Sequence, residues 1–309
     1  MSTRNRGAPR MTARRCFGKA ILILALFVIA TMRFDIITIF PDFFRGPLDY
    51  GVLRRAREQK LVNIEIHDLR AFTHDRHQTV DDRPFGGGEG MVLKPQPIFE
   101  CIESLGIRSR EHRLLPDARE TVILLSAQGR LLHQREAEAF AELEQMVLIC
   151  GRYEGVDERV AEHIADREIS VGDFVLSGGE LGAAIIVDVV ARLIPGVLGN
   201  EASAQQESFS SIVKPSQDGA PDSTCGSGGL LDYPHYTRPA DFRGWTVPEV
   251  LSSGNHDEIR RWRRRKALEK TLRNRPELLD SKLLTQEDRQ LMEGLPNVRA
   301  GGSIPNSKD

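Results

Sequence analysis

The sequence predicts an α/β protein with a mostly parallel sheet, followed by a small, mainly helical C-terminal part. Three observations lead to this prediction. Short β-like runs alternate with helix-like segments through residues 34–194, which is the pattern that parallel sheets with helical crossovers produce. The composition is globular, with 40% hydrophobic and 28% charged residues in a chain of 309. From residue 199 onward the sequence becomes polar and glycine-rich, and then basic and helical.

The predicted strands are short. Three are compact β-like or buried runs, namely Phe34–Phe40, Thr121–Leu125 and Met146–Cys150, and Val62–Leu69 alternates as a half-buried strand does. Pro41 ends the first run, because proline cannot donate to a ladder of hydrogen bonds. Residues 126–129 read as a turn after the third run, and Gly151 closes the fourth.

The predicted helices lie between these strands and after them. They cover residues 50–60, 96–111, 133–145, 156–166, 181–194, 255–274 and 277–293. The helix 181–194 is apolar around most of its surface, so we expect it to be buried in the core or against another subunit. Pro195 and Gly196 end it.

The stretch Ser170–Glu180, reading SVGDFVLSGGE, is the centre of the predicted site. Its apolar half, from Val171 to Leu176, is β-like. The pair Gly178-Gly179 lets the backbone turn through positive φ and lets another group approach the main chain closely. Neither G-x-G-x-x-G nor G-x-x-x-x-G-K-[ST] occurs, so the phosphate-cradling loops are excluded. We expect main-chain groups to hold a flat, uncharged ring.

Three segments end a predicted buried strand with glycine or a small residue. They are Leu125-Ser126-Ala127, Ile149-Cys150-Gly151 and Leu176-Ser177-Gly178-Gly179. At one edge of a parallel sheet these turns would form a single pocket. The alternative is three unrelated loops, and spacing alone does not decide between them.

The long polar loop 72–92 collects histidines, aspartates and three consecutive glycines. A loop of this length in a compact domain is usually functional. One interpretation is a metal site made by His74, His77, Asp75, Asp81 and Asp82. Since the H-x-x-H spacing lacks a third strong ligand, we expect a structural or RNA-facing cluster and no metal site.

Charge and cysteine content restrict the class of protein. The net charge is −2, so binding to nucleic acid would need a local basic patch. The four cysteines, Cys16, Cys101, Cys150 and Cys225, are isolated from one another. Neither a zinc ribbon nor a disulfide framework is predicted, and a reducing cytoplasm fits best.

The first 31 residues combine a basic stretch with the apolar run Ala20–Ala30. This run is shorter than the about 20 residues that cross a bilayer. It resembles a signal peptide, but no small-residue cleavage site follows it. We expect a disordered or misannotated extension, with Met32 as the functional start and no stable association with a membrane.

The C-terminal part begins after a composition shift. Residues 199–229 read as a flexible linker, with an insertion at 212–228 rich in Pro, Gly, Ser and Asp. Residues 230–295 read as a helical domain and 296–309 as a frayed tail. The run Arg260–Lys266 places six basic residues around Trp262. We expect this patch to contact RNA phosphates, and the alternative is an ordinary solvated helix face.

Several long motifs resemble the bacterial tRNA (guanine-N1)-methyltransferase family TrmD, of the SPOUT superfamily. They are FTHDRHQTVDDRPFGGGEGM, CGRYEGVDERV, SVGDFVLSGGE, RLIPGVLGNEAS, LLDYPHYTRP and LSSGNHDEIRRWRR, in order across about residues 32–293. The resemblance implies a trefoil-knotted parallel sheet with helices on both faces in residues 32–198. It also implies a homodimer with its active site between subunits. The implied reaction methylates N1 of the guanine 3′ of the anticodon, position 37, and so maintains the reading frame.

The resemblance further implies S-adenosylmethionine as the methyl donor. The donor-binding residues carried over by position are Leu125, Ser126, Gly151, Tyr153, Glu154, Val171, Gly172, Asp173, Phe174, Val175, Leu176, Ser177, Gly178 and Gly179. A nucleoside sulfonium has no phosphate, which agrees with the absent phosphate motifs. Relatives usually carry proline where Ala127 stands. The resemblance also allows for Mg²⁺ in the reaction without indicating a ligand.

Methyl transfer requires removal of the guanine N1 proton, and a positioned carboxylate is the expected base. The family aspartate matches Glu207 here, one methylene longer, so the surrounding loop must adjust. Asp232 is the reserve candidate. Arg192 matches the arginine that faces the guanine O6, and its alternative role is to extend from an apolar helix into water. The residues expected near tRNA are Asp81, Ser203, His235, Arg238, Arg264 and Arg265.

Three rival functions remain at the level of sequence. A non-catalytic RNA-binding protein would use the same basic helix and would not bind S-adenosylmethionine. A metal-dependent hydrolase would use the histidine and aspartate loop. A methyltransferase acting on a different RNA position would share the fold, and only the family motifs argue against it.

Overall fold

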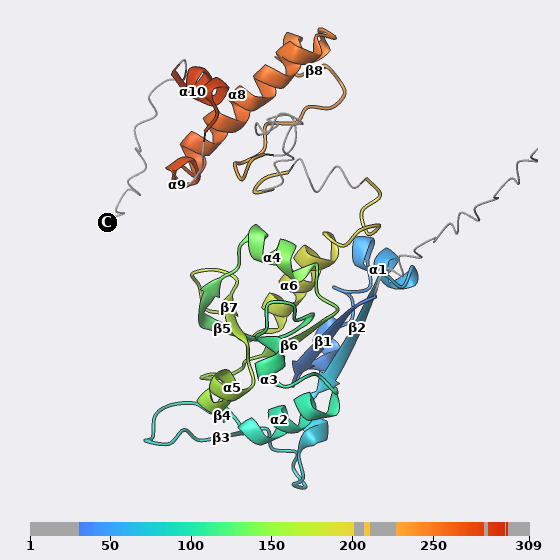
Figure 1. The fold of residues 1–309 in the computed structure, drawn as a ribbon, viewed down its shortest axis with the longest axis vertical. Helices are drawn as coiled ribbons and strands as arrows, with labels where there is room; N and C mark the ends of the chain where they lie inside the picture. Colours follow the sequence, from blue (N-terminus) through green and yellow to red (C-terminus); the bar gives the residue numbers. More distant parts are fainter. Residues whose placement is uncertain (1–30, 201–206, 211–226, 281–283, 294, 296–309) are drawn as a thin grey trace, which may run out of the picture.

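The computed structural model describes residues 31–200, 207–210, 227–280, 284–293 and 295 (Figure 1). The N-terminal extension before residue 31, most of the predicted linker, Ser203 and the tail lie outside these ranges. No helix within the described ranges is long and apolar enough to cross a membrane.

A five-stranded sheet forms the centre of the molecule, with the strand order β2-β1-β6-β5-β7 (Figure 1). The strands are β1 (Met32–Thr38), β2 (Val62–Asp68), β5 (Glu120–Leu131), β6 (Gln145–Cys150) and β7 (Arg167–Ser170). Every pairing between neighbours is parallel. The predicted parallel sheet is therefore confirmed.

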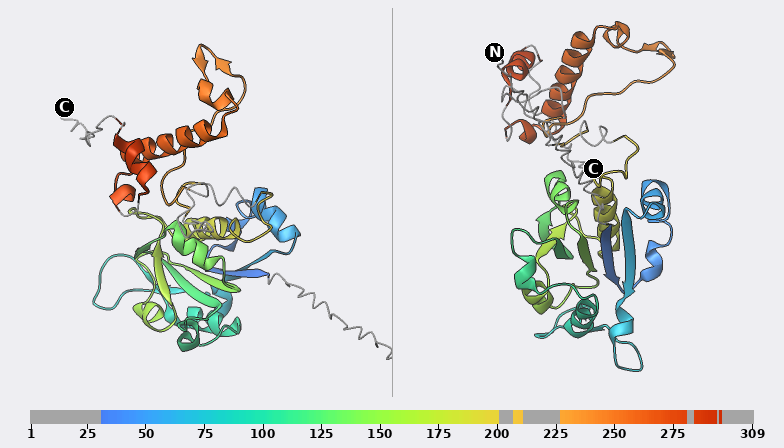
Figure 2. Two further views of the ribbon diagram at one scale, coloured as in Figure 1. Left: turned by 45° about the horizontal axis from the view of Figure 1, so that its top comes forward. Right: turned by 45° about the vertical axis from the view of Figure 1, so that its right-hand side comes forward.

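Helices cover both faces of this sheet, as the left view of Figure 2 shows. One hydrophobic cluster joins the sheet to α1 (Gly51–Glu58), α4 (Gln134–Phe140) and α6 (Glu180–Ala191). A second cluster joins the opposite face to α2 (Pro95–Ser104) and α5 (Glu158–His163). The short elements are η1 (Pro41–Phe44), η2 (Leu69–Phe72), β3 (Asp81–Asp82), β4 (Val92–Leu93) and α3 (Arg110–Arg113).

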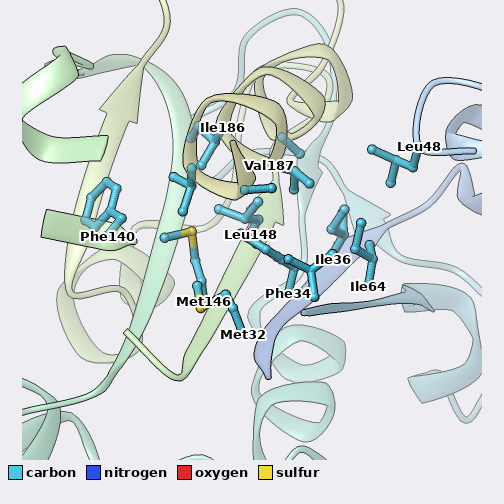
Figure 3. Packing of buried hydrophobic residues seen from close by; sticks show 14 of the residues in the cluster. Met32, Phe34, Ile36, Leu48, Ile64, Phe140, Met146, Leu148, Ile186 and Val187 are labelled. Carbon is cyan, nitrogen blue, oxygen red and sulfur yellow. The ribbon is translucent and has the colours of Figure 1, made fainter. Parts of the chain in front are cut away.

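The larger cluster is built where α6 lies on the sheet. Ile186 and Val187 of α6 point toward Met146 and Leu148 of β6, and all four side chains are completely buried (Figure 3). Burying an aliphatic side chain of this size contributes about 1.5–3 kcal/mol relative to exposure. The opposite face of α6 stays exposed at Leu181 and Ile185.

Several predicted elements differ from the structure. The predicted turn at 126–129 lies inside β5, where pairing with β7 stops at Leu125 and resumes at Arg130. The predicted helix 96–111 ends after Ser104, because Gly106 adopts a positive φ of 67° that a helix cannot continue through. The predicted strand from Val171 to Leu176 is irregular, and the real strand, β7, lies just before it.

The C-terminal elements gather apart from the sheet in Figure 1. They are β8 (Asp241–Phe242), β9 (Trp245–Thr246), η3 (Glu249–Ser252), α8 (His256–Asn274), α9 (Glu277–Asp280) and α10 (Gln286–Glu293). Helix α8 matches the prediction, and Asn255 caps it by accepting from the Glu258 N–H. The predicted single helix 277–293 is wrong, since α9 and α10 are separate. Leu230, Leu268 and Leu279 form a small core between these elements.

A buried carboxylate connects three neighbouring strands. Asp35 of β1 is fully buried and accepts from Arg33 at 2.8 Å and from Gln145 of β6 at 2.8 Å. His67 of β2 places Nε2 2.7 Å from the same carboxylate. Burial alone would raise the pKa of Asp35, but these hydrogen bonds outweigh it and hold the pKa below its usual value. The ionised side chain therefore stabilises the sheet.

We predict that Asp35→Asn lowers the free energy of unfolding by about 2 kcal/mol near neutral pH, because two donors lose an ionised acceptor. Since the folded pKa is depressed, the stabilisation is present above the unfolded pKa of 3.8 and is lost as pH falls through the folded value. Urea unfolding followed by circular dichroism would show a difference that shrinks below about pH 4. Asp42→Asn, at a carboxylate whose side chain is 75% exposed, is the control. A difference that does not change with pH would contradict this role.

Candidate functional site

The carboxyl end of β6 and the loop after β7 enclose a cavity of about 330 Å³ next to the point where β5 leaves its pairing with β7. Leu125 lies opposite Cys150 in one pairing and opposite Ile169 in the other, so the three strands reach the same level. The predicted residues that line the cavity are Leu125, Ser126, Gly151, Tyr153, Glu154, Val171, Phe174, Val175, Leu176, Ser177, Gly178 and Gly179. The three turns therefore meet at one cavity.

Gly129 and Gly179 let the main chain pack tightly beside this cavity. A Cβ on Gly179 would lie 2.8 Å from the Cys150 Cα and 3.1 Å from the Leu125 Cβ. The Gly179 N–H donates to the Gly151 carbonyl at 2.9 Å. A Cβ on Gly129 would lie 2.5 Å from the Ile169 nitrogen. These positions need glycine for close approach.

The structure corrects two details of the predicted cavity. The Gly178-Gly179 pair does not turn through positive φ, since Gly179 has a φ of −75°. Gly172 and Asp173 are not among the lining residues. The Phe174 ring instead lies over Gly172, where a Cβ would come within 2.1 Å of it.

The loop after β6 is also tied to the polar loop 72–92, which the sequence did not indicate. The Glu154 N–H donates to the Met91 carbonyl at 3.0 Å, and the Leu93 N–H donates to the Gly155 carbonyl at 3.0 Å. The Glu154 side chain lies against Gly90. Glycine at position 90 thus leaves room for a carboxylate that borders the cavity.

Arg152 lines the same cavity and lies within the stretch from Gly151 to Glu154 that was predicted to hold the donor. A larger cavity, of about 1000 Å³, lies between α3, α4 and the β5–β7 edge. Its lining mixes arginine and acidic side chains and contains none of the predicted donor or catalytic residues, so we place the candidate site at the smaller cavity.

Arg192 and Glu207 form a two-pronged ion pair at the C-terminal end of α6. Arg192 is the residue that follows the helix, and its Nη2 donates to Glu207 Oε2 at 2.6 Å. Its Nη1 contacts the other carboxylate oxygen. The hydrogen bond to Glu207 raises the pKa of Arg192. Both side chains are about a quarter exposed, at 27%. The two residues predicted to be catalytic therefore lie together.

A third cavity, of about 730 Å³, lies between the segment 233–238 and α8. His235 and Arg238, both predicted near tRNA, line it. His235 stacks on Tyr233 at 4.6 Å between ring centres, and the Arg263 guanidinium lies 4.9 Å from the centre of the Tyr233 ring. Asp232 holds His235 at 2.9 Å. This surface combines aromatic rings with positive charge.

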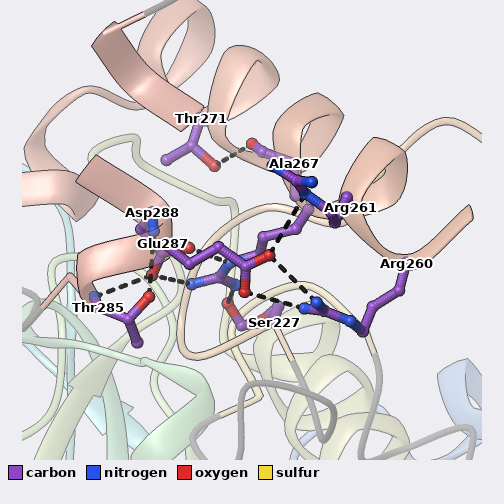
Figure 4. A network of polar contacts seen from close by, with 9 residues as sticks. Ser227, Arg260, Arg261, Ala267, Thr271, Thr285, Glu287 and Asp288 are labelled. Carbon is purple, nitrogen blue, oxygen red and sulfur yellow. Dashed lines mark hydrogen bonds and ion pairs between the residues drawn. The ribbon is translucent and has the colours of Figure 1, made fainter. Parts of the chain in front are cut away.

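The structure corrects the role predicted for Arg264. Its Nε and Nη2 donate to Asp288 of α10 at 2.6 and 2.9 Å, and its Nη1 donates to the Ser227 carbonyl at 3.0 Å. Only 16% of its side chain is exposed. Figure 4 shows Asp288 and Glu287 facing α8. Arg264 therefore joins α8 to α10 and cannot present its guanidinium to RNA, whereas Arg265 is exposed on α8.

Parts of the polar loop 72–92 have a structural role. Asp75 accepts from the backbone N–H groups of His77 and Thr79, each at 2.9 Å, which fixes a tight turn. His74 contacts Glu100 of α2 at 2.8 Å. Asp81 pairs with Leu93 between β3 and β4. Ser203 lies outside the described residues.

A parallel sheet with a cavity at its strand ends, joined to helices with a basic and aromatic surface, defines an α/β protein with a small-ligand site and a surface suited to nucleic acid. Residues 32–281 match the family model described as tRNA (Guanine-1)-methyltransferase TrmD. The chain belongs to this family. The predicted family is confirmed.

Three relatives illustrate how close this match is. A tRNA (guanine-N(1)-)-methyltransferase of Koribacter versatilis is 63% identical over 270 residues, which cover 87% of this chain and 99% of the relative. Proteins of the same name from Dictyoglomus turgidum and Geobacter metallireducens are 50% and 48% identical. These alignments cover 85% and 84% of this chain, and 96% of each relative.

We predict that Arg264→Ala destabilises the C-terminal helices by about 3 kcal/mol, because it leaves the buried Asp288 carboxylate without its partner. Both tryptophans, Trp245 and Trp262, lie in this part, so their fluorescence reports its unfolding in urea. Arg273→Ala, at an exposed position on the same helix, should leave the midpoint near that of wild type. If Arg264→Ala instead left the unfolding midpoint unchanged and weakened RNA binding, the first prediction, that Arg264 contacts RNA phosphates, would hold.

Proposed function

We propose that this chain transfers the methyl group of S-adenosylmethionine to N1 of guanine 37 in tRNA. Family membership and the names of the relatives support this reaction. The observation that carries it in the structure is the Arg192–Glu207 pair at the end of α6. A guanine edge offers an acceptor, O6, beside a donor, N1–H. A guanidinium can donate to O6 while the carboxylate beside it accepts from N1–H.

The cavity at the strand ends fits the methyl donor. Its lining combines main-chain turns with apolar side chains such as Leu125, Val171 and Leu176, which suit a flat base. The carboxylate of Glu154 suits a positively charged group. Close main-chain packing at Gly179 leaves no phosphate cradle there. When bound, S-adenosylmethionine supplies a methyl group on positively charged sulfur.

We propose Glu207 as the general base and Arg192 as the group that stabilises O6. The Glu207 carboxylate takes the N1 proton, and the freed lone pair of N1 forms the new bond to the methyl carbon. The bond from that carbon to sulfur breaks at the same time, and its electron pair stays on sulfur, which leaves as a neutral thioether. Negative charge that develops on O6 is held by the Arg192 guanidinium. The ion pair keeps the longer glutamate side chain beside Arg192, which compensates for its extra methylene. Asp232 already binds His235 and remains the reserve base.

One chain cannot easily bring the donor cavity to this pair. Helix α6 begins at Glu180, the residue after Gly179, which lines the cavity. Arg192 lies at the opposite end of the helix, directly after its last residue. Twelve residues of helix separate them, about 18 Å at the usual rise. We therefore propose a homodimer in which Glu207 and Arg192 of one subunit serve the donor cavity of the other. The exposed Leu181 and Ile185 on α6 give this dimer an apolar surface.

The finer architecture is part of the same proposal. We propose residues 32–198 as the catalytic domain, 199–229 as a linker and 230–295 as the tRNA-binding domain, with a tail at 296–309. The close passage of Gly129 and Gly179 past neighbouring strands supports a trefoil knot in the first domain. For tRNA contacts we propose Asp81, Ser203, His235, Arg238 and Arg265. We also propose a cytoplasmic location, and Mg²⁺ as an aid to the reaction.

We predict that Glu207→Gln binds S-adenosylmethionine as wild type does but loses methyl transfer by about 100-fold or more, because an amide cannot accept the N1 proton. Mass spectrometry of an anticodon stem-loop would measure the added methyl group. The stem-loop with adenine in place of guanine 37 should gain none.

Glu207→Asp is the matched control for this experiment. It restores the shorter carboxylate expected from the family and should keep most of the turnover. Near-normal turnover in Glu207→Gln would instead move the base elsewhere, with Asp232 as the next residue to replace.

We predict that two inactive chains regain activity when mixed. One carries Glu207→Gln, and the other carries Ala127→Trp, which fills the donor cavity that Ala127 lines. A heterodimer pairs one intact cavity with one intact Glu207, so purified heterodimers should reach about half of wild-type turnover. An inactive heterodimer of verified composition would show that each site lies within one chain.

A further inference from the structure

Arg152, in the loop after β6, lines the donor cavity and contacts three other segments of the chain. Its Nη1 donates to the Ser177 carbonyl at 3.0 Å. Its Nη2 lies 2.9 Å from Oε2 of Glu180, the first residue of α6. Its guanidinium also lies 4.5 Å from the centre of the Phe40 ring, just after β1. One side chain therefore joins the β6 loop to the loop before α6, to α6 itself and to the end of β1.

Glu180 fixes the other side of this contact. Its carboxylate is 1% exposed, and its Oε1 accepts from the Thr38 hydroxyl at 2.7 Å. The Thr38 oxygen in turn accepts from the Phe40 N–H at 2.9 Å. Its Oε2 forms an ion pair with Arg152. A charge this deeply buried needs such compensation, and its place in the first helical turn adds a favourable interaction with the helix dipole.

Gly178 lies directly beneath the Arg152 guanidinium. A Cβ at this position would lie 2.1 Å from Nε of Arg152. The main chains of the two residues also form an isolated antiparallel bridge. The loop 177–179 is thus held between Arg152 on one side and the ends of β5 and β6 on the other. A displaced guanidinium would free the loop that closes the cavity.

We propose that Arg152 and Glu180 are positioning residues that set the affinity of the cavity for S-adenosylmethionine. This inference rests on the proposed function, because it takes that donor as the ligand. The two residues hold the loop 177–179, while Arg192 and Glu207 act at the other end of α6. Loss of the contact should therefore raise the KM for the donor and leave kcat at saturating donor near its wild-type value.

Arg152→Lys tests this inference. Lysine keeps a positive charge for Glu180, but it lacks the planar fork that donates to Ser177 and stacks on Phe40 at once. Isothermal titration of the full chain with S-adenosylmethionine, without RNA, should show affinity reduced by about 10- to 100-fold. Steady-state kinetics should show a similar rise in the KM for the donor, with kcat changed by less than about threefold.

Two further variants separate positioning from stability. Arg159→Lys changes a comparable arginine, which pairs with Asp157 through Nε at 2.7 Å and Nη2 at 2.8 Å and is 60% exposed. It should leave donor affinity unchanged. Gly178→Ala keeps Arg152 but forces its guanidinium aside, so it should reproduce the loss of affinity. Thermal unfolding of each variant is measured in parallel.

The outcomes are distinct. A wild-type chain that does not bind the donor overturns the proposed function, and this inference with it. A wild-type chain that binds, with Arg152→Lys binding equally tightly, overturns the positioning role alone. Loss of kcat in proportion to a lowered Tm in both Arg152→Lys and Gly178→Ala also overturns that role, since it would indicate a general loss of stability.

Discussion

The close approach of main chain to main chain at the strand ends is the constraint on which the site depends. Gly179 rests against Cys150 and Leu125 and donates to the Gly151 carbonyl. Any larger side chain there would push the loop away from the sheet, because the surrounding atoms are backbone and cannot rotate aside. The cavity, the start of α6 and the position of Arg152 all follow from this contact.

Helix α6 connects the cavity at the strand ends with the Arg192–Glu207 pair. Its buried face, with Ile186 and Val187, fixes it on the sheet, and its first residue is held by a buried carboxylate network. Its other end carries Arg192 and, through Arg192, Glu207. Because a packed helix is rigid, the cavity at the strand ends and the Arg192–Glu207 pair are held at a fixed separation.

Comparison of sequence and structure shows where sequence patterns were reliable. Apolar runs marked β1 and β6 closely, since burial on both faces requires them. Alternation of apolar and polar residues marked β2, which is buried on one face. They were unreliable in the donor loop. Phe174 and Val175 looked like strand residues, yet they are 55% and 85% exposed beside the cavity. An apolar run does not reveal whether its side chains face a core or a ligand site, because the two need the same residue types.

The sequence by itself determined the family, the parallel α/β class and most of the residues that line the cavity at the strand ends. These follow from long local motifs and from the periodicity of apolar residues. Only the tertiary structure decided which arginine of the basic run joins two helices. Arg264 donates to the buried Asp288 of a later helix. Such a partner is distant in sequence, and only folding brings it close.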